Sequence, residues 1–340
     1  RTLKLLMAAM ATSARAERRV LSIQSHVVHG YVGNKSAVFP LQLHGFDVDF
    51  VNSVQFSNHT GYKTFTGEVL NGEQLEKLVE GLASNGLLEG YSHLLTGYIG
   101  SVSFLRAVCS VYRRLKEQNP GLVYVCDPVL GDNGKLYVPQ ELVQIYREEM
   151  LPLATILTPN QFECEQLLGQ PMVTEEDAVF ACLWLHRQGP QVVVVTSMDS
   201  SISPDHMIML ASKLPSSSAP TVSSNPGNPE VLRLLIPRQR GSYTGTGDLT
   251  AALLLAHLSD TSVSLAEAIA RVVATLQGVI ARTAGKGRGE LRLVQSKDII
   301  EHPDASRFVP EPVDPDLLRN AQARLEGIAE AEVGGRASSS

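Results

Sequence analysis

Two spacings of hydrophobic and polar residues alternate along the chain from Arg19 onward. Short runs rich in β-branched residues are typical of strands, and the longer stretches with apolar positions three and four apart are typical of helices. The predicted strands cover residues 20–23, 48–51, 93–96, 122–126, 155–157, 192–195, 207–210 and 232–236. The predicted helices cover residues 35–44, 72–85, 101–118, 139–150, 161–168 and 177–187, with two more after residue 245. This alternation predicts an α/β fold, with a mainly parallel central β-sheet flanked by helices on both faces.

The last two predicted strands differ from the others because no helix separates them. We therefore expect residues 207–210 and 232–236 to be antiparallel strands. Between them, residues 214–229 are rich in Ser, Pro and Asn, which predicts a flexible surface insertion. The four consecutive valines from Val192 suit a strand that is buried on both faces.

Both ends of the chain are expected to lie outside the folded domain, which we place at residues 19–300. Residues 1–18 are rich in Ala and basic residues, and three interpretations stay open: an organelle transit segment, a secretory signal or a disordered leader. The expected compartment is the cytoplasm, with plastid or mitochondrion as the alternative. Residues 301–340 are expected to form a loosely held tail with at most one short helix.

The composition excludes several classes of partner. The 340 residues are 44% hydrophobic, which is ample for a large core, and only 19% are charged. With a net charge of −6 and no basic stripe, the chain is not expected to bind nucleic acid or an anionic membrane. No apolar run reaches the ~20 residues of a membrane span. The four cysteines form no C-x-x-C pair, and we expect reduced, mostly buried thiols.

A glycine-rich turn, Gly245-Thr246-Gly247-Asp248, precedes an apolar stretch that is expected to be a buried helix. The first amides of such a helix have no partner within the helix and carry the positive end of its dipole. Glycine allows this backbone to approach a phosphate closely. Asp248 has two interpretations at this point, because an acidic residue in a first helical turn can cap the helix or handle a proton.

Small polar residues and carboxylates follow the ends of the predicted strands throughout the chain. Seven segments carry them: residues 24–26, 52–62, 96–98, 127–132, 158–163, 196–197 and 245–248. In an open parallel sheet, ligands bind outside the carboxyl ends of the strands. One carboxylate at a strand end is common, but seven converging segments favour a functional site along one rim of the sheet.

Carboxylates in two of these segments point to a cation site. Asp127 and Asp132 bracket Pro-Val-Leu-Gly, and Asn160 and Glu163 open the next predicted helix. Oxygen ligands beside an anion site suit Mg²⁺, although Asp127 is also an ordinary turn residue and Glu163 an ordinary first-turn acid. The chain lacks the P-loop and G-x-G-x-x-G motifs. Together these features predict phosphoryl transfer on a fold outside the P-loop class.

Six parts of the chain resemble the pyridoxal kinases of the ribokinase-like superfamily, within residues 19–297. They are residues 22–26 with 30–34, 52–62, 95–98, 123–132, 158–163 and 245–248. The sequence Gly-Thr-Gly-Asp at 245–248 marks the superfamily, and Asn-Ser-Val-Gln-Phe-Ser-Asn-His-Thr-Gly-Tyr at 52–62 narrows it to pyridoxal kinases. The resemblance implies a ribokinase-like fold and ATP-dependent phosphorylation of the 5′-hydroxymethyl group of pyridoxal, pyridoxine and pyridoxamine.

The resemblance also implies roles for individual residues. Asp248 would take the proton from the 5′-hydroxymethyl group, and the amides of Gly245, Thr246 and Gly247 would hold the transferring phosphoryl group. The positions that contact the vitamer are matched by Ser25, Val32, His59, Thr60, Tyr98 and Asp248. The positions that hold ATP are matched by Asp127, Tyr137, Thr158, Asn160, Glu163, Thr196, Ser197 and Thr246. The Mg²⁺ ligands would come from Asp127, Asp132, Thr158 and Glu163, with K⁺ near Asp127 and Thr158.

The resemblance further implies a homodimer that binds ATP and pyridoxal-type vitamers. Two other functions stay open. One is a hydroxymethylpyrimidine kinase of the same superfamily, and the other is a catalytically silent regulator that binds a nucleotide or vitamer on the same fold. The intact turn at residues 245–248 argues against the silent regulator.

Overall fold

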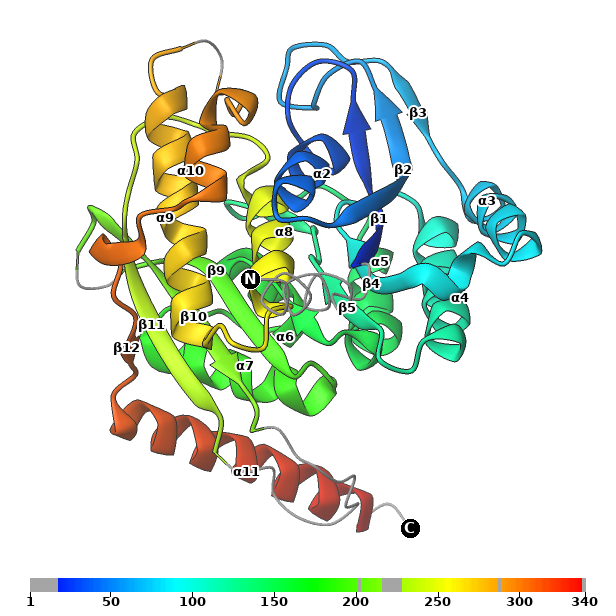
Figure 1. Cartoon of the computed structure of the whole chain (residues 1–340). Coiled ribbons are helices and arrows are strands. Elements are labelled where there is room, and N and C mark those ends of the chain that lie inside the picture. The colour runs from blue at the N-terminus through cyan, green and yellow to red at the C-terminus, as the bar shows by residue number, and fades with distance from the viewer. Residues whose placement is uncertain (1–17, 201–202, 216–227, 287–288, 338–340) are drawn as a thin grey trace, which may run out of the picture.

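The computed structural model describes residues 18–200, 203–215, 228–286 and 289–337. Within these ranges a ten-stranded sheet has the order β12-β11-β10-β9-β8-β5-β4-β1-β2-β3 (Figure 1). Its strands are β1 (Arg19–Val27), β2 (Asp47–Phe56), β3 (Gly67–Val69), β4 (Tyr91–Thr96), β5 (Val123–Cys126), β8 (Ile156–Leu157), β9 (Val192–Asp199), β10 (His206–Lys213), β11 (Glu230–Pro237) and β12 (Glu311–Pro312). A separate hairpin joins β6 (Gly131–Asp132) to β7 (Lys135–Leu136).

The middle of the sheet is parallel and both of its margins are antiparallel. Strands β2, β1, β4, β5, β8 and β9 pair in parallel. The margins add β3 on one side and β10, β11 and β12 on the other, all antiparallel. The prediction of a mainly parallel sheet with one late antiparallel pair is confirmed. Strand β1 extends four residues beyond its predicted end at Ile23, because the polar residues Gln24 and His26 still pair with β2.

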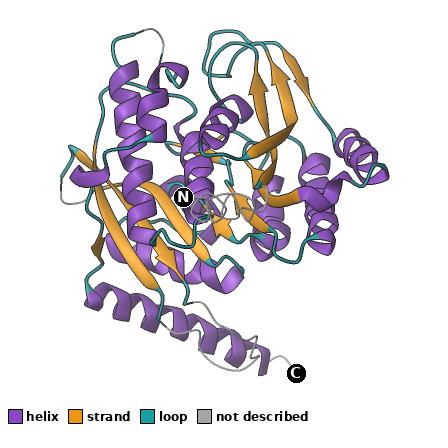
Figure 2. Cartoon of the chain, in the orientation of Figure 1, coloured by secondary structure: helices purple, strands orange, loops and turns teal. Residues whose placement is uncertain are grey.

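Helices cover both faces of the sheet, as predicted (Figure 2). One face packs against α3 (Gly72–Ser84), α4 (Val102–Gln118), α5 (Glu141–Ile145), α6 (Gln161–Leu168), α7 (Glu175–Gln188) and α11 (Pro315–Ala337). The other face packs against α2 (Asn34–Leu43), α8 (Thr246–Leu258), α9 (Leu265–Thr283) and α10 (Lys297–Glu301). Helix α8 is buried over most of its length, from Leu249 to His257, so its first turn is held firmly at the rim of the sheet.

The expectation of a loosely held C-terminal tail with at most one short helix is wrong. Strand β12 pairs with β11, and the long helix α11 lies along α7 (Figure 1). Ala321 and Leu325 enter the core, while the Arg324 guanidinium donates to Asp177 at 2.8 Å and lies 4.1 Å from the centroid of the Phe180 ring. Between residues 315 and 328 of α11, a narrow apolar stripe is buried while most positions are exposed, so the overall composition of this segment concealed its helix.

Two further differences from the predicted elements concern residues 131–150. The segment expected as one helix over 139–150 is α5 followed by a π-helical turn at Tyr146–Met150. The β6–β7 hairpin was not predicted, although Asn133-Gly134, with φ of +51° and +73°, is a strong hairpin signal.

The four cysteines are free and buried, as expected. Among the described helices, none combines the length and apolar character needed to cross a membrane. Residues 1–17 of the proposed leader at 1–18, and residues 216–227 of the insertion at 214–229, lie outside the described residues.

Candidate active site

The glycine-rich turn at the start of α8 is packed tightly against the loop between β1 and α2. Gly245 has a φ of +87°, and a Cβ added there would lie 2.1 Å from the carbonyl oxygen of Tyr31. The Ser36 hydroxyl donates to the Gly245 carbonyl at 3.0 Å. Only glycine satisfies both the backbone angle and this close approach, so the turn presents its amides in one defined conformation.

Asp248, in the first turn of α8, is held by a residue far away in sequence. Its Oδ2 accepts a hydrogen bond from the backbone N–H of Gly33 at 2.7 Å. Within the described ranges it accepts none from the amides of its own helix, so the capping interpretation has no hydrogen bond to support it. Burial raises the pKa of Asp248, and the hydrogen bond from Gly33 opposes that rise. A carboxylate with one fixed oxygen and a raised pKa is suited to accept a proton with the other.

Gly33 links Asp248 to the predicted vitamer side. It has a φ of +52°, and an added Cβ would lie 2.1 Å from the carbonyl oxygen of Ser25 and 2.4 Å from its hydroxyl. Ser25, at the polar end of β1, therefore lies directly against the residue that holds the catalytic candidate. The sequence contained Gly33 within a matched segment but gave no sign that its N–H would hold Asp248.

Two buried carboxylates, Asp127 and Glu163, follow β5 and open α6. Asp127 is 4% exposed and accepts a hydrogen bond from the Thr158 hydroxyl at 3.1 Å. Glu163, also 4% exposed, accepts from the backbone N–H of Leu130 at 3.0 Å and of Asn160 at 2.8 Å. The Asn160 side chain accepts from the Glu163 N–H in return, which completes a capping box. Glu163 thus ties the segment after β5 to the start of α6.

The carboxylates of Asp127, Glu163 and Asp248 influence one another. Burial first, and then the negative charge of Asp248, raise the pKa of Asp127. Burial and the charge of Asp127 raise the pKa of Glu163 well above its usual value. No lysine or arginine of the described chain is among the causes of these shifts. The three carboxylates therefore lack a compensating positive charge, which a bound cation would supply.

The arrangement fits a cation that is only partly held by protein. The described residues contain no cluster of three or more His, Cys, Asp or Glu side chains that could hold a metal ion by themselves. Mg²⁺ is usually bound by one or two carboxylates together with water and substrate phosphates, which matches this donor set. Gly247, in the glycine-rich turn, would place an added Cβ 3.8 Å from Asp127 Oδ2, so the carboxylate faces the turn.

The other predicted nucleotide residues lie around this centre with different exposure. Asp132 is exposed on the β6–β7 hairpin, where its carboxylate accepts from the N–H and side chain of Asn133. Tyr137 is 53% exposed, and its N–H donates to the Leu130 carbonyl at 2.8 Å. Thr196 donates from its N–H to the Pro159 carbonyl at 2.9 Å, which places β9 beside the Thr158 segment, and Ser197 follows half-buried.

The predicted vitamer residues lie on the β1–β2–β4 side of Asp248. Val32 packs in a small apolar cluster with Val27, Val54 and Phe56, and Tyr98 packs against it. Burial raises the pKa of Tyr98. His59 is largely covered and Thr60 is exposed, both in the loop after β2. This side therefore combines an apolar wall with polar groups, as a small aromatic alcohol requires.

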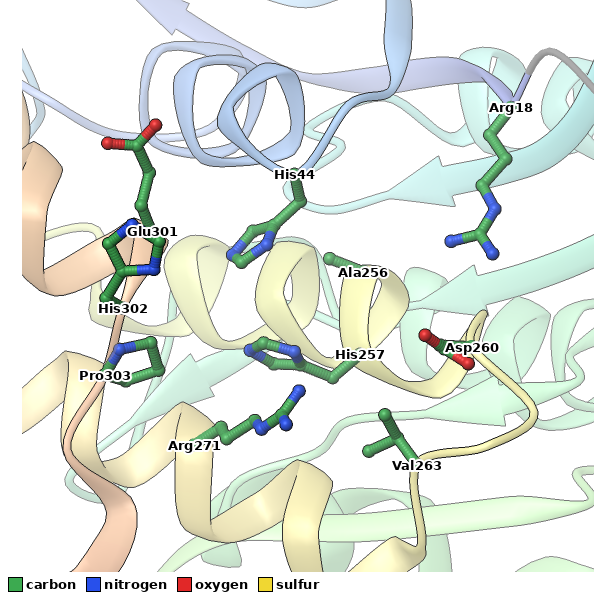
Figure 3. A pocket seen from close by; sticks show the side chains of 10 residues that line it. All are labelled: Arg18, His44, Ala256, His257, Asp260, Val263, Arg271, Glu301, His302 and Pro303. Atoms are coloured by element: carbon green, nitrogen blue, oxygen red, sulfur yellow. The ribbon is translucent and has the colours of Figure 1, made fainter. Parts of the chain in front are cut away.

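A separate cavity lies away from this site. It has a volume of about 360 Å³ and lies at the C-terminal end of α8, where His44, His257 and Arg271 lie close together and Arg18 lies to one side, near Asp260 (Figure 3). Asp248 and His257 are nine residues apart on α8, which corresponds to about 14 Å along the helix. The cavity contains none of the residues that the sequence placed in the site.

The sequence of this chain is similar to those of known kinases. The family model described as phosphomethylpyrimidine kinase matches residues 92–293. The pyridoxal kinase of Arabidopsis thaliana is 51% identical over 295 residues, which cover 84% of this chain and 92% of that protein. The pyridoxal kinase of Homo sapiens is 46% identical over 307 residues, covering 85% of this chain and 96% of that protein.

Solved structures agree with the sequence relatives. The pyridoxal kinase of Leishmania donovani in complex with ADP and ginkgotoxin aligns with a TM-score of 0.80 and 37% identity, over 88% of this chain and 100% of that chain. The same protein in complex with ADP and pyridoxamine aligns with a TM-score of 0.80 and 36% identity, again over 88% of this chain and 100% of that chain.

Proposed function

The chain belongs to the pyridoxal kinase family, and from this premise we propose that it transfers the γ-phosphoryl group of ATP to the 5′-hydroxymethyl group of pyridoxal. Pyridoxine and pyridoxamine are proposed as further acceptors, and the product from pyridoxal is pyridoxal 5′-phosphate. The fold is ribokinase-like. The observation that carries the proposal is Asp248 at the start of α8, with one oxygen fixed by Gly33 and the buried carboxylate of Asp127 facing the same turn.

Asp248 is proposed as the general base. Its Oδ2 is occupied by the Gly33 N–H, which leaves Oδ1 to receive the proton of the 5′-hydroxyl group. The hydroxyl oxygen then forms a bond to the γ-phosphorus while the bond to the β–γ bridging oxygen breaks, giving ADP. The transition state of phosphoryl transfer is loose, so a weak base that orients the hydroxyl is sufficient.

The amides that open α8 are proposed to stabilise the transferring group. The backbone N–H groups of Gly245, Thr246 and Gly247 stand at the positive end of the helix dipole. Their conformation is fixed by the contact of Gly245 with Tyr31 and Ser36 before any ligand binds. Donors that are already oriented need no reorganisation as negative charge moves onto the phosphoryl oxygens.

A divalent cation accompanies ATP in this reaction, and we propose Mg²⁺. Asp127, Thr158 and Glu163 would hold it, largely through water, whereas Asp132 is bonded to its own hairpin. When bound, the cation would neutralise phosphate oxygens and polarise the γ-phosphorus. A monovalent cation, K⁺, is proposed near Asp127 and Thr158 because of the same uncompensated negative charge.

A coupled ADP-release assay with MgATP and K⁺ tests the function, using pyridoxal, hydroxymethylpyrimidine or no acceptor. We expect ADP release that depends on pyridoxal, with pyridoxal phosphate absorbance appearing in step. Turnover with the pyrimidine alone would show instead a hydroxymethylpyrimidine kinase, a function that the description of the matched family model favours. Ligand binding without turnover would favour a silent regulator.

A homodimer is proposed as the assembly. The margin of the sheet at β2 and β3 carries exposed apolar side chains, with Phe50, Phe65 and Val69 each about half exposed. A second copy would cover them, since exposed apolar side chains on one margin of a protein often mark interfaces. Light scattering should give twice the chain mass, and a monomer at assay concentration would refute the dimer.

The compartment is also a proposal. We propose the cytoplasm, with plastid or mitochondrion as the alternative if residues 1–18 direct import. A fluorescent protein fused to residues 1–18 should stay in the cytoplasm, and its import into an organelle would support the alternative.

A further inference from the structure

Glu290 joins three segments that are far apart in sequence. Its Oε2 accepts from the backbone N–H of Tyr31 at 3.0 Å, and its Oε1 accepts from the Tyr62 hydroxyl at 2.9 Å. Residue 31 lies in the loop after β1, and residue 62 lies in the loop after β2. One carboxylate therefore connects both loops that carry the predicted vitamer residues Val32, His59 and Thr60.

The position of Glu290 is itself fixed to the phosphoryl turn. It forms an isolated parallel bridge with Thr244, the residue directly before Gly245. Gly289, with a φ of +85°, would place an added Cβ 2.1 Å from the Ser242 carbonyl oxygen, so this approach also requires glycine. The Glu290 backbone thus lies beside the start of the turn that holds the transferring group, while its side chain reaches the vitamer loops.

The Glu290 carboxylate packs closely against Gly30. A Cβ added at Gly30, whose φ is +97°, would lie 2.3 Å from Glu290 Oε2. The Glu290 side chain is 16% exposed. Gly30 therefore allows the carboxylate to approach the Tyr31 N–H from a direction that any other residue would block.

His59 completes the group. Its Nδ1 accepts a hydrogen bond from the Gly61 N–H at 3.1 Å, so the neutral ring carries its proton on Nε2. Nε2 lies 3.2 Å from Glu290 Oε1, although the contact is not aligned as a hydrogen bond. The imidazole also contacts the Tyr62 ring, with centroids 4.6 Å apart. Glu290 thus accepts hydrogen bonds from the Tyr31 N–H and the Tyr62 hydroxyl and has the His59 ring beside it.

We propose that Glu290 is a positioning residue that sets the vitamer loops against the phosphoryl turn. The proposal rests on the proposed function, because its consequence is the alignment of the acceptor alcohol with the transferring phosphoryl group. Glu290 touches neither reacting atom. The contacts of the Glu290 side chain lie on the acceptor side, away from Asp127, Thr158 and Thr196. Removal of this side chain therefore lowers kcat/KM for the vitamer and leaves KM for ATP nearly unchanged.

Steady-state kinetics of Glu290→Ala and Glu290→Gln test this role. Alanine removes both hydrogen bonds, and we expect kcat/KM for pyridoxal to fall about 10–100-fold while KM for ATP changes less than about twofold. Glutamine can accept from the Tyr31 N–H and donate to the Tyr62 oxygen, so it should retain activity within about fivefold of wild type. Glu175→Gln is the matched control, because Glu175 is similarly covered, at 11% exposed, but pairs with Arg233 elsewhere.

Hydrogen–deuterium exchange provides a readout that does not need turnover. Peptides covering residues 28–33 and 58–62 should exchange faster in Glu290→Ala than in wild type, with no change around residues 123–132. If Glu290→Ala fails to fold, Tyr62→Phe removes the hydrogen bond from the Tyr62 hydroxyl to Glu290 and should shift kcat/KM for pyridoxal in the same direction, by about 2–5-fold.

Three results would separate the possible failures. An equal rise in KM for ATP and for pyridoxal would make Glu290 a general structural residue and overturn the proposal. Unchanged exchange at both loops would overturn it as well. Absence of pyridoxal phosphorylation by the wild-type enzyme would refute the proposed function, while exchange at the two loops would still decide whether Glu290 holds them.

Discussion

The two ends of α8 bury ionisable groups in opposite ways. At the first turn, Asp248 faces the buried carboxylate of Asp127, and burial raises the pKa of both. At the last turn, the His257 ring lies 4.9 Å from the His44 ring, and burial lowers the pKa of His257 to about 4. Burial thus favours the neutral form at both ends. The carboxyl groups at the first turn retain their protons, and the imidazole at the last turn loses its proton.

The difference lies in what each end offers a ligand. The first turn has helix amides with no partner within the helix, and Gly245 makes a close backbone contact that only glycine allows. Segments that follow several strands of the sheet also meet there. The last turn borders a cavity of about 360 Å³, yet Asp260 in its lining already accepts from Ser262 and Arg271 pairs with Glu267. We therefore assign the candidate site to the first turn because strand ends meet a helix N-terminus there, and not because of a cavity or shifted pKa values, which the last turn also has.

The largest expected effect separates the two ends directly. Asp248→Asn should retain ATP binding and lose roughly 10²–10⁴-fold in kcat, because the amide does not accept the proton of the acceptor alcohol. His257→Gln, at the other end of the same helix, should keep kcat within about threefold. ADP release and nucleotide titration measure both variants. A rate near wild type in Asp248→Asn would remove this residue from the mechanism.

The next prediction tests the close contact between Gly245 and the Tyr31 carbonyl group. Gly245→Ala should lower kcat/KM about 10–100-fold and destabilise the fold, since its Cβ would lie 2.1 Å from the Tyr31 carbonyl oxygen. Gly285→Ala is the matched control, because Gly285 has a φ of +71° but nothing within 4 Å of an added Cβ. The control should lose about 1 kcal/mol of stability and no activity. Equal kinetic losses in the two variants would show that backbone strain alone explains the effect.

A smaller effect concerns the free energy of unfolding at low pH, to which His257 at the last turn of α8 contributes. The pKa of His257 is lowered to about 4 in the folded state, whereas the unfolded value is 6.5. Below pH 6.5 the unfolded chain binds more protons at this residue, so its contribution to stability is lost as the pH falls toward 4. The loss should reach about 2 kcal/mol at pH 5. Urea titrations from pH 7 to 5 should show a shallower decline in His257→Gln, and parallel declines would contradict this assignment.

The smallest effect concerns the carboxylate end at higher pH. The folded-state pKa values of Asp127 and Asp248 are raised, so stability present at low pH is lost as the pH rises through those values. A bound cation relieves the repulsion, and MgADP should therefore raise Tm by a few °C more at pH 8 than at pH 6. Asp127→Asn should remove this pH dependence. A larger Tm gain at pH 6 would reverse the expected sign.

Local patterns in the sequence were sufficient to predict most of the elements and to propose the residues of the candidate site. Strand and helix periods predicted the α/β fold, and Gly245–Asp248 was identified because a glycine-rich turn before an apolar helix has a direct physical meaning. Asp127 and Glu163 were identified by their positions at strand and helix ends. The C-terminal helix α11 escaped prediction because its stability depends on packing against α7 rather than on its own composition.

By itself, the sequence determined which short segments would fold as strands, helices and tight turns, because those choices depend on neighbouring residues. Only the tertiary structure decided which of those segments meet. Strand order in the sheet is not chain order, with β1 between β2 and β4. That order brings Gly33 to Asp248 across 215 positions and Tyr31 to Glu290 across 259. Contacts over such separations depend on how the whole sheet assembles, so no local pattern encodes them.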